Sequence, residues 1–258
     1  MRSAIRAGAV IVACALLCGA NAAAAAAPGR AAPSTDAAGF ALLELFTSEG
    51  CSSCPPADAL LARLVSESRD SGRRVYALSF HVDYWDRLGW KDRFSSAAWS
   101  RRQGEYARRF DLGSLYTPQL VVNGAKEMVG SDATQVEAAL HAALARAARV
   151  PVMVHATARG LDVSVHCKVE QAPAGAVLLV AWVDATASSA PDNGENRGRA
   201  LHHVHVVRDL RSVPLDRPFD AAVELKRPEI RDGAVIAWVQ EAGAGAVVGA
   251  AAAELKAR

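Results

Sequence analysis

The sequence lacks the hallmarks of several protein classes. Its formal net charge is only +2, which is too balanced to indicate a nucleic-acid partner or an anionic membrane surface. Beyond the N-terminal region no apolar run is long enough to cross a bilayer, and no internal repeat is evident. The 258 residues are 51% hydrophobic, so the chain is large and apolar enough to form two ordinary domains.

The chain has few cysteines, and two of them lie in a predicted targeting segment. Five cysteines are present, of which Cys14 and Cys18 fall in a stretch with basic residues, an apolar run and then an alanine tract. This order is typical of a secretory signal peptide, so we expect residues 1–27 to be removed and residues 28–38 to be a linker. A loose lipobox match leaves lipidation of Cys14 as an alternative. The expected location is periplasmic or secreted, with no membrane span after cleavage.

The mature chain would keep three cysteines, namely Cys51, Cys54 and Cys167. That number excludes a disulfide-dense scaffold, and the absence of a second CxxC motif excludes a four-ligand zinc site of that type. Cys167 shares strand parity with Val163 and Val165, which predicts a buried cysteine that acts as a small hydrophobic residue.

The sequence does contain one CxxC pair, which follows an apolar run over residues 40–46. A helix is expected to start at the pair, and the N-terminus of a helix stabilises a thiolate. Cys51 is therefore predicted to be an exposed nucleophile at an electropositive helix end, with Cys54 one turn inside the helix as the resolving thiol. Two alternatives remain open: a static structural disulfide, or two ligands of a metal completed elsewhere. Thiol–disulfide exchange needs only the two sulfurs, so no cofactor is expected.

The pattern along the chain predicts an α/β domain over residues 39–149 and an all-β domain over residues 150–258. In the first part, apolar runs alternate with helical spacings, which favours a parallel βαβ start, a hairpin and a closing helix. In the second part, six or seven short strands separated by turns indicate a β-sandwich. The expected strands are residues 40–46, 75–80, 119–123, 125–129, 152–154, 161–165, 177–183, 201–207, 222–225, 235–239 and 246–255, and the expected helices follow the cysteines, span 95–110 and start after Asp132.

Polar and aromatic residues follow the second expected strand. The carboxyl ends of parallel strands lie at one edge of a sheet, so His81 and Asp83 are predicted to lie beside Cys51. His81 would shuttle a proton or stabilise a thiolate, and Asp83 would orient it. The alternative is a rigid, hydrogen-bonded loop. The tryptophans would line this edge or fill the core, with the core favoured for the last of them; they are Trp85, Trp90 and Trp99.

Two further patterns allow both a functional and a purely structural interpretation, and a third indicates only a solvent-exposed helix face. His203 and His205 would share one face of a strand and His202 the other, an arrangement that can ligate Zn or Cu but more often is exposed or paired with carboxylates. The turn-rich segment 193–198 is either an ordinary hairpin connection or a docking element against the first domain. The arginine pairs 101/102 and 108/109 are expected on the solvated face of a helix.

Several strings of the mature sequence resemble known proteins. The segment 40–149, with CxxC after its first strand and Thr117-Pro118 before its third, is similar to the thioredoxin fold. The resemblance implies that Pro118 is cis and packs against the dithiol, and that the backbone of Thr117 pairs with the substrate chain. More closely, the strings at residues 44–58, 80–92, 116–124 and 194–210 resemble DUF1223, a family of exported, uncharacterised thioredoxin-like proteins.

The resemblance to thioredoxin is incomplete at the active motif. The string Gly50-Cys51-Ser52-Ser53-Cys54 stands where thioredoxin has Trp-Cys-Gly-Pro-Cys. Glu44 is offset by one residue from the buried aspartate of thioredoxin, which puts it on the opposite face of the strand. The family resemblance therefore implies fold and compartment more than activity.

The leading hypothesis is an exported thiol–disulfide oxidoreductase that acts on protein or small-molecule thiols. The alternatives are a non-catalytic periplasmic binding module with a structural disulfide, and a copper- or zinc-handling protein that uses both cysteines of the pair and His81. The expected catalytic group is Cys51, Cys54, His81 and Pro118, and the expected substrate contacts are Thr117, Tyr116, Trp85 and Asp83.

Overall fold

The computed structural model describes residues 39–257. The predicted signal peptide, the predicted linker and Cys14 lie outside the described residues. Within residues 39–257, no helix combines the length and the apolar character that a membrane span needs.

The elements occur in the order expected from the sequence, and the C-terminal strands extend further than expected. The strands are β1 (Ala41–Thr47), β2 (Val75–His81), β3 (Gln119–Val122), β4 (Lys126–Val129), β5 (Met153–Arg159), β6 (Asp162–Val169), β7 (Val177–Ser189), β8 (Leu201–Pro214), β9 (Phe219–Lys226), β10 (Gly233–Gln240) and β11 (Val247–Leu255). The helices are α1 (Pro55–Ser71), α2 (Ala97–Arg109) and α3 (Ala133–Leu144), with a short 3-10 helix η1 over Asp86–Leu88.

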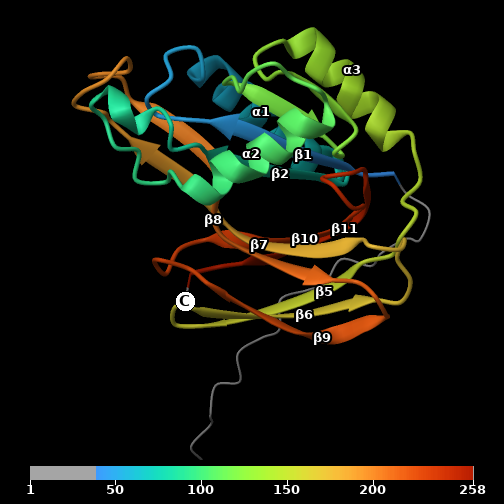
Figure 1. Cartoon of the computed structure of the whole chain (residues 1–258). Helices are drawn as coiled ribbons and strands as arrows, with labels where there is room; N and C mark the ends of the chain where they lie inside the picture. The colour runs from blue at the N-terminus through green and yellow to red at the C-terminus, as the bar shows by residue number, and fades with distance from the viewer. Residues whose placement is uncertain (1–38, 258) are drawn as a thin grey trace, which may run out of the picture.

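The strands form a mixed α/β architecture with one large sheet and one small sheet. The large sheet has eight strands in the order β11-β10-β7-β8-β2-β1-β3-β4, and the small sheet has three in the order β5-β6-β9. β1 and β2 are parallel, as predicted, and β3 is antiparallel to β1. The large sheet crosses the predicted domain boundary at residues 149–150, because β8 pairs in parallel with β2 at Ser79 and Val206 (Figure 1). Four of the strands after residue 150 therefore extend the N-terminal sheet.

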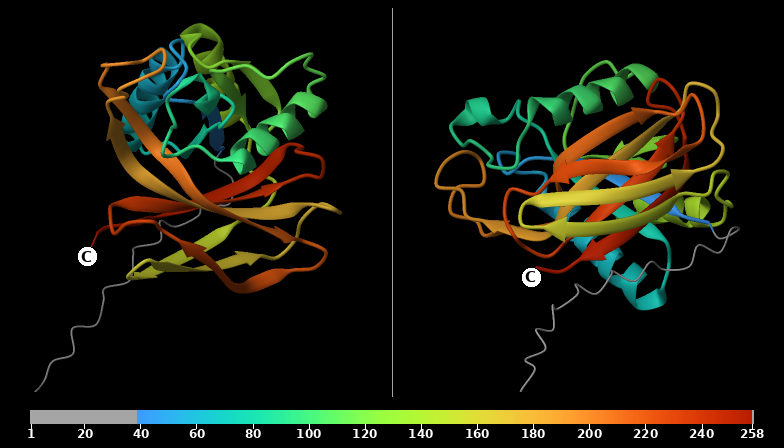
Figure 2. Two further views of the ribbon diagram at one scale, coloured as in Figure 1. Left: turned by 60° about the vertical axis from the view of Figure 1, so that its left-hand side comes forward. Right: turned by 90° about the horizontal axis from the view of Figure 1, so that it is seen from below.

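Strand β10 is buried on both faces. Every residue of β10 is buried, so the alternation expected of a half-buried strand is absent. Val235 and Ala237 pack into one core with β5, β6 and β9, whereas Ile236 and Trp238 pack into another with α2 and β1. Figures 1 and 2 show β7, β10 and β11 as a middle layer between the helices and the small sheet. Cys167 is buried in the first of these cores, as predicted.

Helices cover both faces of β1. Leu43 and Leu45 pack into a core with α1 and α3, while Leu42 and Phe46 pack into the core with α2. Trp99 of α2 is buried in the latter core, as favoured from the sequence. A strand covered on both sides needs apolar residues at successive positions, which is what the unbroken apolar run of β1 indicates.

The turn between β3 and β4 meets the turn between β10 and β11. Gly124 has a φ of +60°, and a methyl group at this position would overlap the backbone carbonyl oxygen of Gly245. We expect Gly124→Ala to lower the free energy of unfolding by about 2–4 kcal/mol, because it combines a left-handed backbone with a steric clash.

Gly160→Ala is the matched control for this variant. Gly160 has a φ of +58°, but no atom of the described chain lies within 4 Å of an added methyl group. We expect this variant to lose only about 1 kcal/mol, because the backbone conformation alone is penalised. Equal losses for the two variants in urea-induced unfolding would contradict the close approach of the two turns.

Candidate dithiol site

The predicted dithiol is present as a disulfide. Cys51 and Cys54 are bonded to each other, with their Cα atoms 5.4 Å apart. Cys54 is the N-cap of α1, and Pro55 and Pro56 occupy the first turn, where a missing N–H group costs little. The expectation that Cys54 lies one turn inside the helix is therefore wrong, because the helix begins after the pair. The positive end of the helix dipole nevertheless faces the motif.

The predicted exposure of Cys51 is wrong. Cys51 and Cys54 are each 0% exposed, whereas Ser52 and Ser53 between them are exposed. A thiol in solution can therefore contact the exposed serines of the motif but neither of its sulfur atoms. A segment from far along the chain is hydrogen-bonded to the backbone of the motif.

The covering segment is residues 193–199, in the connection between β7 and β8, and we call it the cover segment. Asn196, which is fully buried, donates its amide to the backbone oxygen of Cys51 at 2.8 Å and to the carbonyl two residues earlier at 2.9 Å. Glu195 accepts the backbone N–H of Ser52 at 2.9 Å, and this hydrogen bond lowers the pKa of the Glu195 carboxyl. Of the two interpretations of this turn-rich loop, docking against the N-terminal part is the one observed.

The Thr117–Pro118 peptide lies next to the motif and is cis, as the resemblance implied. The Ser53 hydroxyl donates to the Thr117 carbonyl at 3.4 Å, and the Trp85 indole N–H donates to the Thr117 hydroxyl at 2.8 Å. Thr117 and Trp85 are therefore brought together beside the motif. Tyr116 is engaged elsewhere, because its hydroxyl donates to a carboxylate of β4 at 2.5 Å.

Asp83 does not orient His81, contrary to prediction. The Asp83 carboxylate accepts the Ser100 hydroxyl at 2.5 Å, and the Asp83 N–H donates to the same hydroxyl at 3.1 Å, so this residue secures the first turns of α2. The partner of His81 is Asp92, whose Oδ2 lies 2.6 Å from His81 Nδ1. Asp92 lies in the segment between η1 and α2.

His81 and Asp92 form a buried imidazole–carboxylate pair, with both side chains 0% exposed. The Asp92 carboxylate also accepts the backbone N–H groups of Glu49 and Phe94, at 2.9 and 2.8 Å. Burial alone would lower the pKa of His81, but the Asp92 carboxylate outweighs it and the pKa of His81 is raised. Burial opposes ionisation of Asp92, but His81 and the backbone donors lower its pKa. A protonated His81 and an ionised Asp92 therefore stabilise each other.

A second histidine, His203 of β8, lies against the first. The two rings meet edge to face with their centroids 4.6 Å apart. The Nε2 of His203 is 3.8 Å from the Glu49 carboxylate, and its Nδ1 is 3.6 Å from the Asp58 carboxylate. All of these side chains are buried. We call Glu49, Asp58, His81, Asp92 and His203 the buried acid–histidine cluster.

The cluster keeps several polar atoms unpaired. Within the described chain, one oxygen each of Glu49 and Asp58, one ring nitrogen of His81 and both ring nitrogens of His203 are buried without a hydrogen-bond partner. Unpaired polar atoms are costly in a protein interior, and functional sites are where perturbed groups of this kind gather. The cluster therefore gathers three carboxyl groups and two imidazoles in the interior, and two of the carboxyl groups, Glu49 and Asp58, flank the cysteine pair in sequence.

His205 does not share a face with His203, contrary to expectation. It has a φ of +49°, which turns the strand at this point, and its Nδ1 lies 3.2 Å from the Ala77 carbonyl oxygen. Burial lowers the pKa of His205. His202 is exposed, with its Nδ1 2.9 Å from the Ser188 hydroxyl. Among residues 39–257, no three or more His, Cys, Asp or Glu side chains are grouped so that they could hold a metal ion.

Sequence reasoning missed four members of the site, which are Glu49, Asp58, Asp92 and Asn196. A signal for the first two was available, because Glu49 and Asp58 flank the cysteine pair within about one helical turn. Asp92 carries no such signal, since it reaches the site only through the path of the loop after β2. For Asn196 the signal was the turn-rich segment 193–198, whose docking against the first domain was one of its two interpretations.

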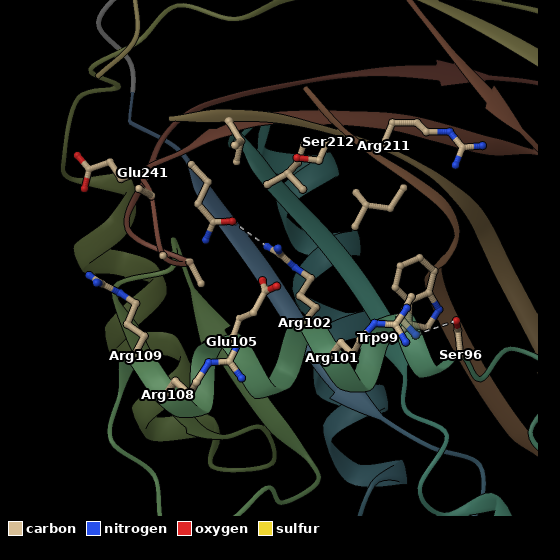
Figure 3. Close-up of a pocket in the computed structure, with 18 of the residues that line it drawn as sticks. Ser96, Trp99, Arg101, Arg102, Glu105, Arg108, Arg109, Arg211, Ser212 and Glu241 are labelled. Atoms are coloured by element: carbon tan, nitrogen blue, oxygen red, sulfur yellow. Dashed lines mark hydrogen bonds between the residues drawn. The ribbon is translucent and has the colours of Figure 1, made fainter. Parts of the chain in front are cut away.

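A pocket away from the dithiol lies between α2 and the strands β7, β8 and β10, with a volume of about 1040 Å³ (Figure 3). Arg102 lines it and makes a two-point ion pair with Glu44 at 2.5 and 2.9 Å. The expectation that Arg102 is solvated is wrong, because its side chain points inward against β1 and β10. The other arginines of α2 are exposed as expected; they are Arg101, Arg108 and Arg109.

Comparisons with known proteins agree with this architecture. A crystal structure of a protein from Agrobacterium tumefaciens is similar to the chain, with 29% sequence identity and a TM-score of 0.64. The similarity covers 84% of this chain and 94% of that protein. No curated protein matches the chain. The family described as a protein of unknown function, DUF1223, matches residues 42–240, a range that contains the cysteine pair and the cover segment. The chain therefore belongs to the DUF1223 family.

Proposed function

We propose that the protein is an exported thiol–disulfide oxidoreductase whose Cys51–Cys54 pair exchanges with the disulfides or thiols of proteins or small molecules. The observation that carries this proposal is the position of the pair. The two cysteines are bonded in the connection between β1 and α1, directly before the N-terminus of α1. A helix N-terminus favours the thiolate over the thiol, so the reduced pair would be acidified there.

A thioredoxin-like assignment of residues 39–149 supports the proposal. β1, α1 and β2 form a parallel βαβ unit, followed by α2, the antiparallel pair β3–β4 and α3. The Thr117 carbonyl accepts the Ser53 hydroxyl, so the loop that pairs with substrate in that fold lies against the motif here. The remaining strands would form a sandwich-like unit, in which β5, β6 and β9 pack on β7 and β10.

The exchange has two steps. In the reduced protein, the Cys51 thiolate attacks a substrate disulfide, which forms a mixed disulfide and releases one substrate thiolate to take up a proton. The Cys54 thiolate then attacks the Cys51 sulfur, which forms the Cys51–Cys54 bond and releases the second substrate thiol. The protein loses two electrons and the substrate gains two. In the reverse direction, the oxidised protein accepts two electrons from a substrate dithiol.

The buried acid–histidine cluster supplies groups for the proton that this exchange moves. Cys54 must lose its proton before it attacks, and water does not reach a fully buried thiol easily. Glu49 and Asp58 flank the pair in sequence and are buried with one unpaired oxygen each. A carboxylate or an imidazole held beside the pair can take that proton. His81, the candidate from the sequence, is held protonated by Asp92, so the groups of the cluster that would take this proton are Glu49, Asp58 and His203.

The full burial of both sulfurs favours a second candidate function, which is a binding module stabilised by a structural disulfide. Structural disulfides resist reduction by the glutathione pool, whereas strained or exposed ones are the labile and catalytic ones. In this case the pair would contribute to stability alone. The grouping of side chains within residues 39–257 does not favour the copper- or zinc-handling alternative.

Cysteine-to-serine variants distinguish the two functions. If exchange occurs, Cys54→Ser is expected to accumulate mixed disulfides with glutathione or a cysteine peptide, because Cys51 then has no resolving partner. Cys51→Ser is expected to accumulate none, and intact-protein mass spectrometry measures both. Cys167→Ser is the control, because burial raises the pKa of the Cys167 thiol to about 12 and keeps it unreactive. A wild-type disulfide that survives excess reduced glutathione, with no adduct on Cys54→Ser, would overturn the oxidoreductase and leave the binding module.

A further inference from the structure

We propose that the cover segment, residues 193–199, is a gate that must leave the CxxC motif before a thiol or a disulfide from solution reaches Cys51. Asn196 is the residue that holds this gate closed. The inference rests on the proposed exchange at Cys51, and it concerns how that exchange is controlled. It also assigns a role to the C-terminal half of the chain, which supplies the gate through the β7–β8 connection.

The cover segment closes the motif at its backbone. Cys51 is fully buried although its neighbour Ser52 is exposed, so the barrier over the sulfur is local. Asn196 is itself 0% exposed, and its amide spans the backbone oxygens of Glu49 and Cys51. The side-chain oxygen of Asn196 accepts Arg199 Nη1 at 2.9 Å, so both ends of the amide are held.

The cover segment folds on itself and is joined to the motif through side chains. Its backbone hydrogen bonds close within the same connection, as in the bond of 2.8 Å from the Gly198 N–H to the Pro191 carbonyl. The bonds to the motif are the two from Asn196 and the one from Ser52 to Glu195. A loop of this kind can swing away without breaking a strand, because no ladder hydrogen bond has to open.

Opening the gate would have two effects at the motif. It would expose the Cys51 sulfur to the solvent. It would also release the Ser52 N–H, which the Glu195 carboxylate occupies in the closed state. Backbone N–H groups before a helix are donors that stabilise a thiolate. The same movement would therefore admit the substrate and prepare the nucleophile.

The test is the rate at which dithiothreitol reduces the Cys51–Cys54 disulfide in the folded, full-length protein. Samples are quenched by alkylation, and peptide mass spectrometry assigns the alkylated cysteines. Asn196→Ala removes two of the bonds that close the gate, so we expect it to be reduced about 10- to 100-fold faster than the wild type. Glu195→Ala removes one bond from an exposed side chain, and we expect an increase of about 3- to 10-fold.

Arg197→Gln is the matched control, since Arg197 is an exposed neighbour in the same segment, and its rate is expected to equal that of the wild type. If Asn196→Ala does not fold, the Glu195 variant decides the matter. Reduction rates that stay equal in both test variants, at unchanged stability, would overturn the gate. Faster reduction of the gate variants, with no adducts on Cys54→Ser, would support the gate and refute the oxidoreductase. Adducts on Cys54→Ser, with unchanged reduction rates in the gate variants, would support the oxidoreductase and refute the gate.

Discussion

Replacing Arg102 with methionine is expected to lower the free energy of unfolding by about 3–5 kcal/mol. The Arg102 guanidinium pairs with both oxygens of Glu44 and also donates to Tyr106 and Gln240. All four side chains are buried. Without the guanidinium, the Glu44 carboxylate stays in the interior with no counter-charge, and this uncompensated charge is the main cost.

The ion pair also joins the two parts of the chain. Arg102 is in α2, Glu44 in β1 and Gln240 in β10, and Gln240 donates further to the Gly245 carbonyl at 2.9 Å. Urea-induced unfolding followed by circular dichroism measures the loss. Arg101→Met is the control, because this neighbour is exposed and we expect a change within about 0.5 kcal/mol. Similar losses for both variants would show that the buried pair is not a strong link.

The second large effect is expected for Asp92→Asn, which should lose about 3 kcal/mol near pH 6 and much of the pH dependence that His81 gives the wild type. The folded-state pKa of His81 is raised, so its contribution is fully present below the unfolded value of about 6.5 and is lost as the pH rises through the folded value. The pKa of Asp92 is lowered, so its contribution is present above about pH 3.9 and is lost as the pH falls through the folded value.

The measurement is the free energy of unfolding from about pH 5 to about pH 9, where the titration of His81 dominates. Glu49 and Asp58 also raise the pKa of His81, and His203 packs on its ring, but Asp92 is the largest favourable partner. The variant should therefore keep a shallower decline above pH 6.5 than the wild type. Asp83→Asn is the control, since its carboxylate accepts from Ser100 instead. An unchanged decline in Asp92→Asn would contradict the assigned pair.

Local patterns predicted the elements well. The apolar run at residues 40–46 became β1, and the Asn123-Gly124 pair became the turn between β3 and β4. Asp132 accepts the N–H of Gln135 and caps α3, as expected. These features depend on neighbours within a few residues, whose preferences act whatever the rest of the chain does. The bonding of Cys51 to Cys54 belongs to the same class, because three residues of separation bring the sulfurs together.

Two of the wrong predictions share a different origin. Arg102 was expected in solvent because arginine usually is, but the sheet brings Glu44 beneath it. Asp83 is the predicted partner of His81 because the two are close in sequence. In the structure, the loop after β2 folds back and places Asp92 against the imidazole instead. Each error concerns a side chain whose partner is set by a turn of the backbone that periodicity does not encode.

The sequence by itself determined the family, the order of the elements and the existence of a dithiol at a helix start. Only the tertiary structure decided that both sulfurs are buried and that the acids and histidines of the buried cluster come together. Asn196 is 145 residues from the Cys51 carbonyl that it binds, and His203 comes from β8. Both reach the site because β8 pairs with β2 and continues the N-terminal sheet. Pairing between distant strands depends on the packing of the whole chain, so no local run of residues reveals it.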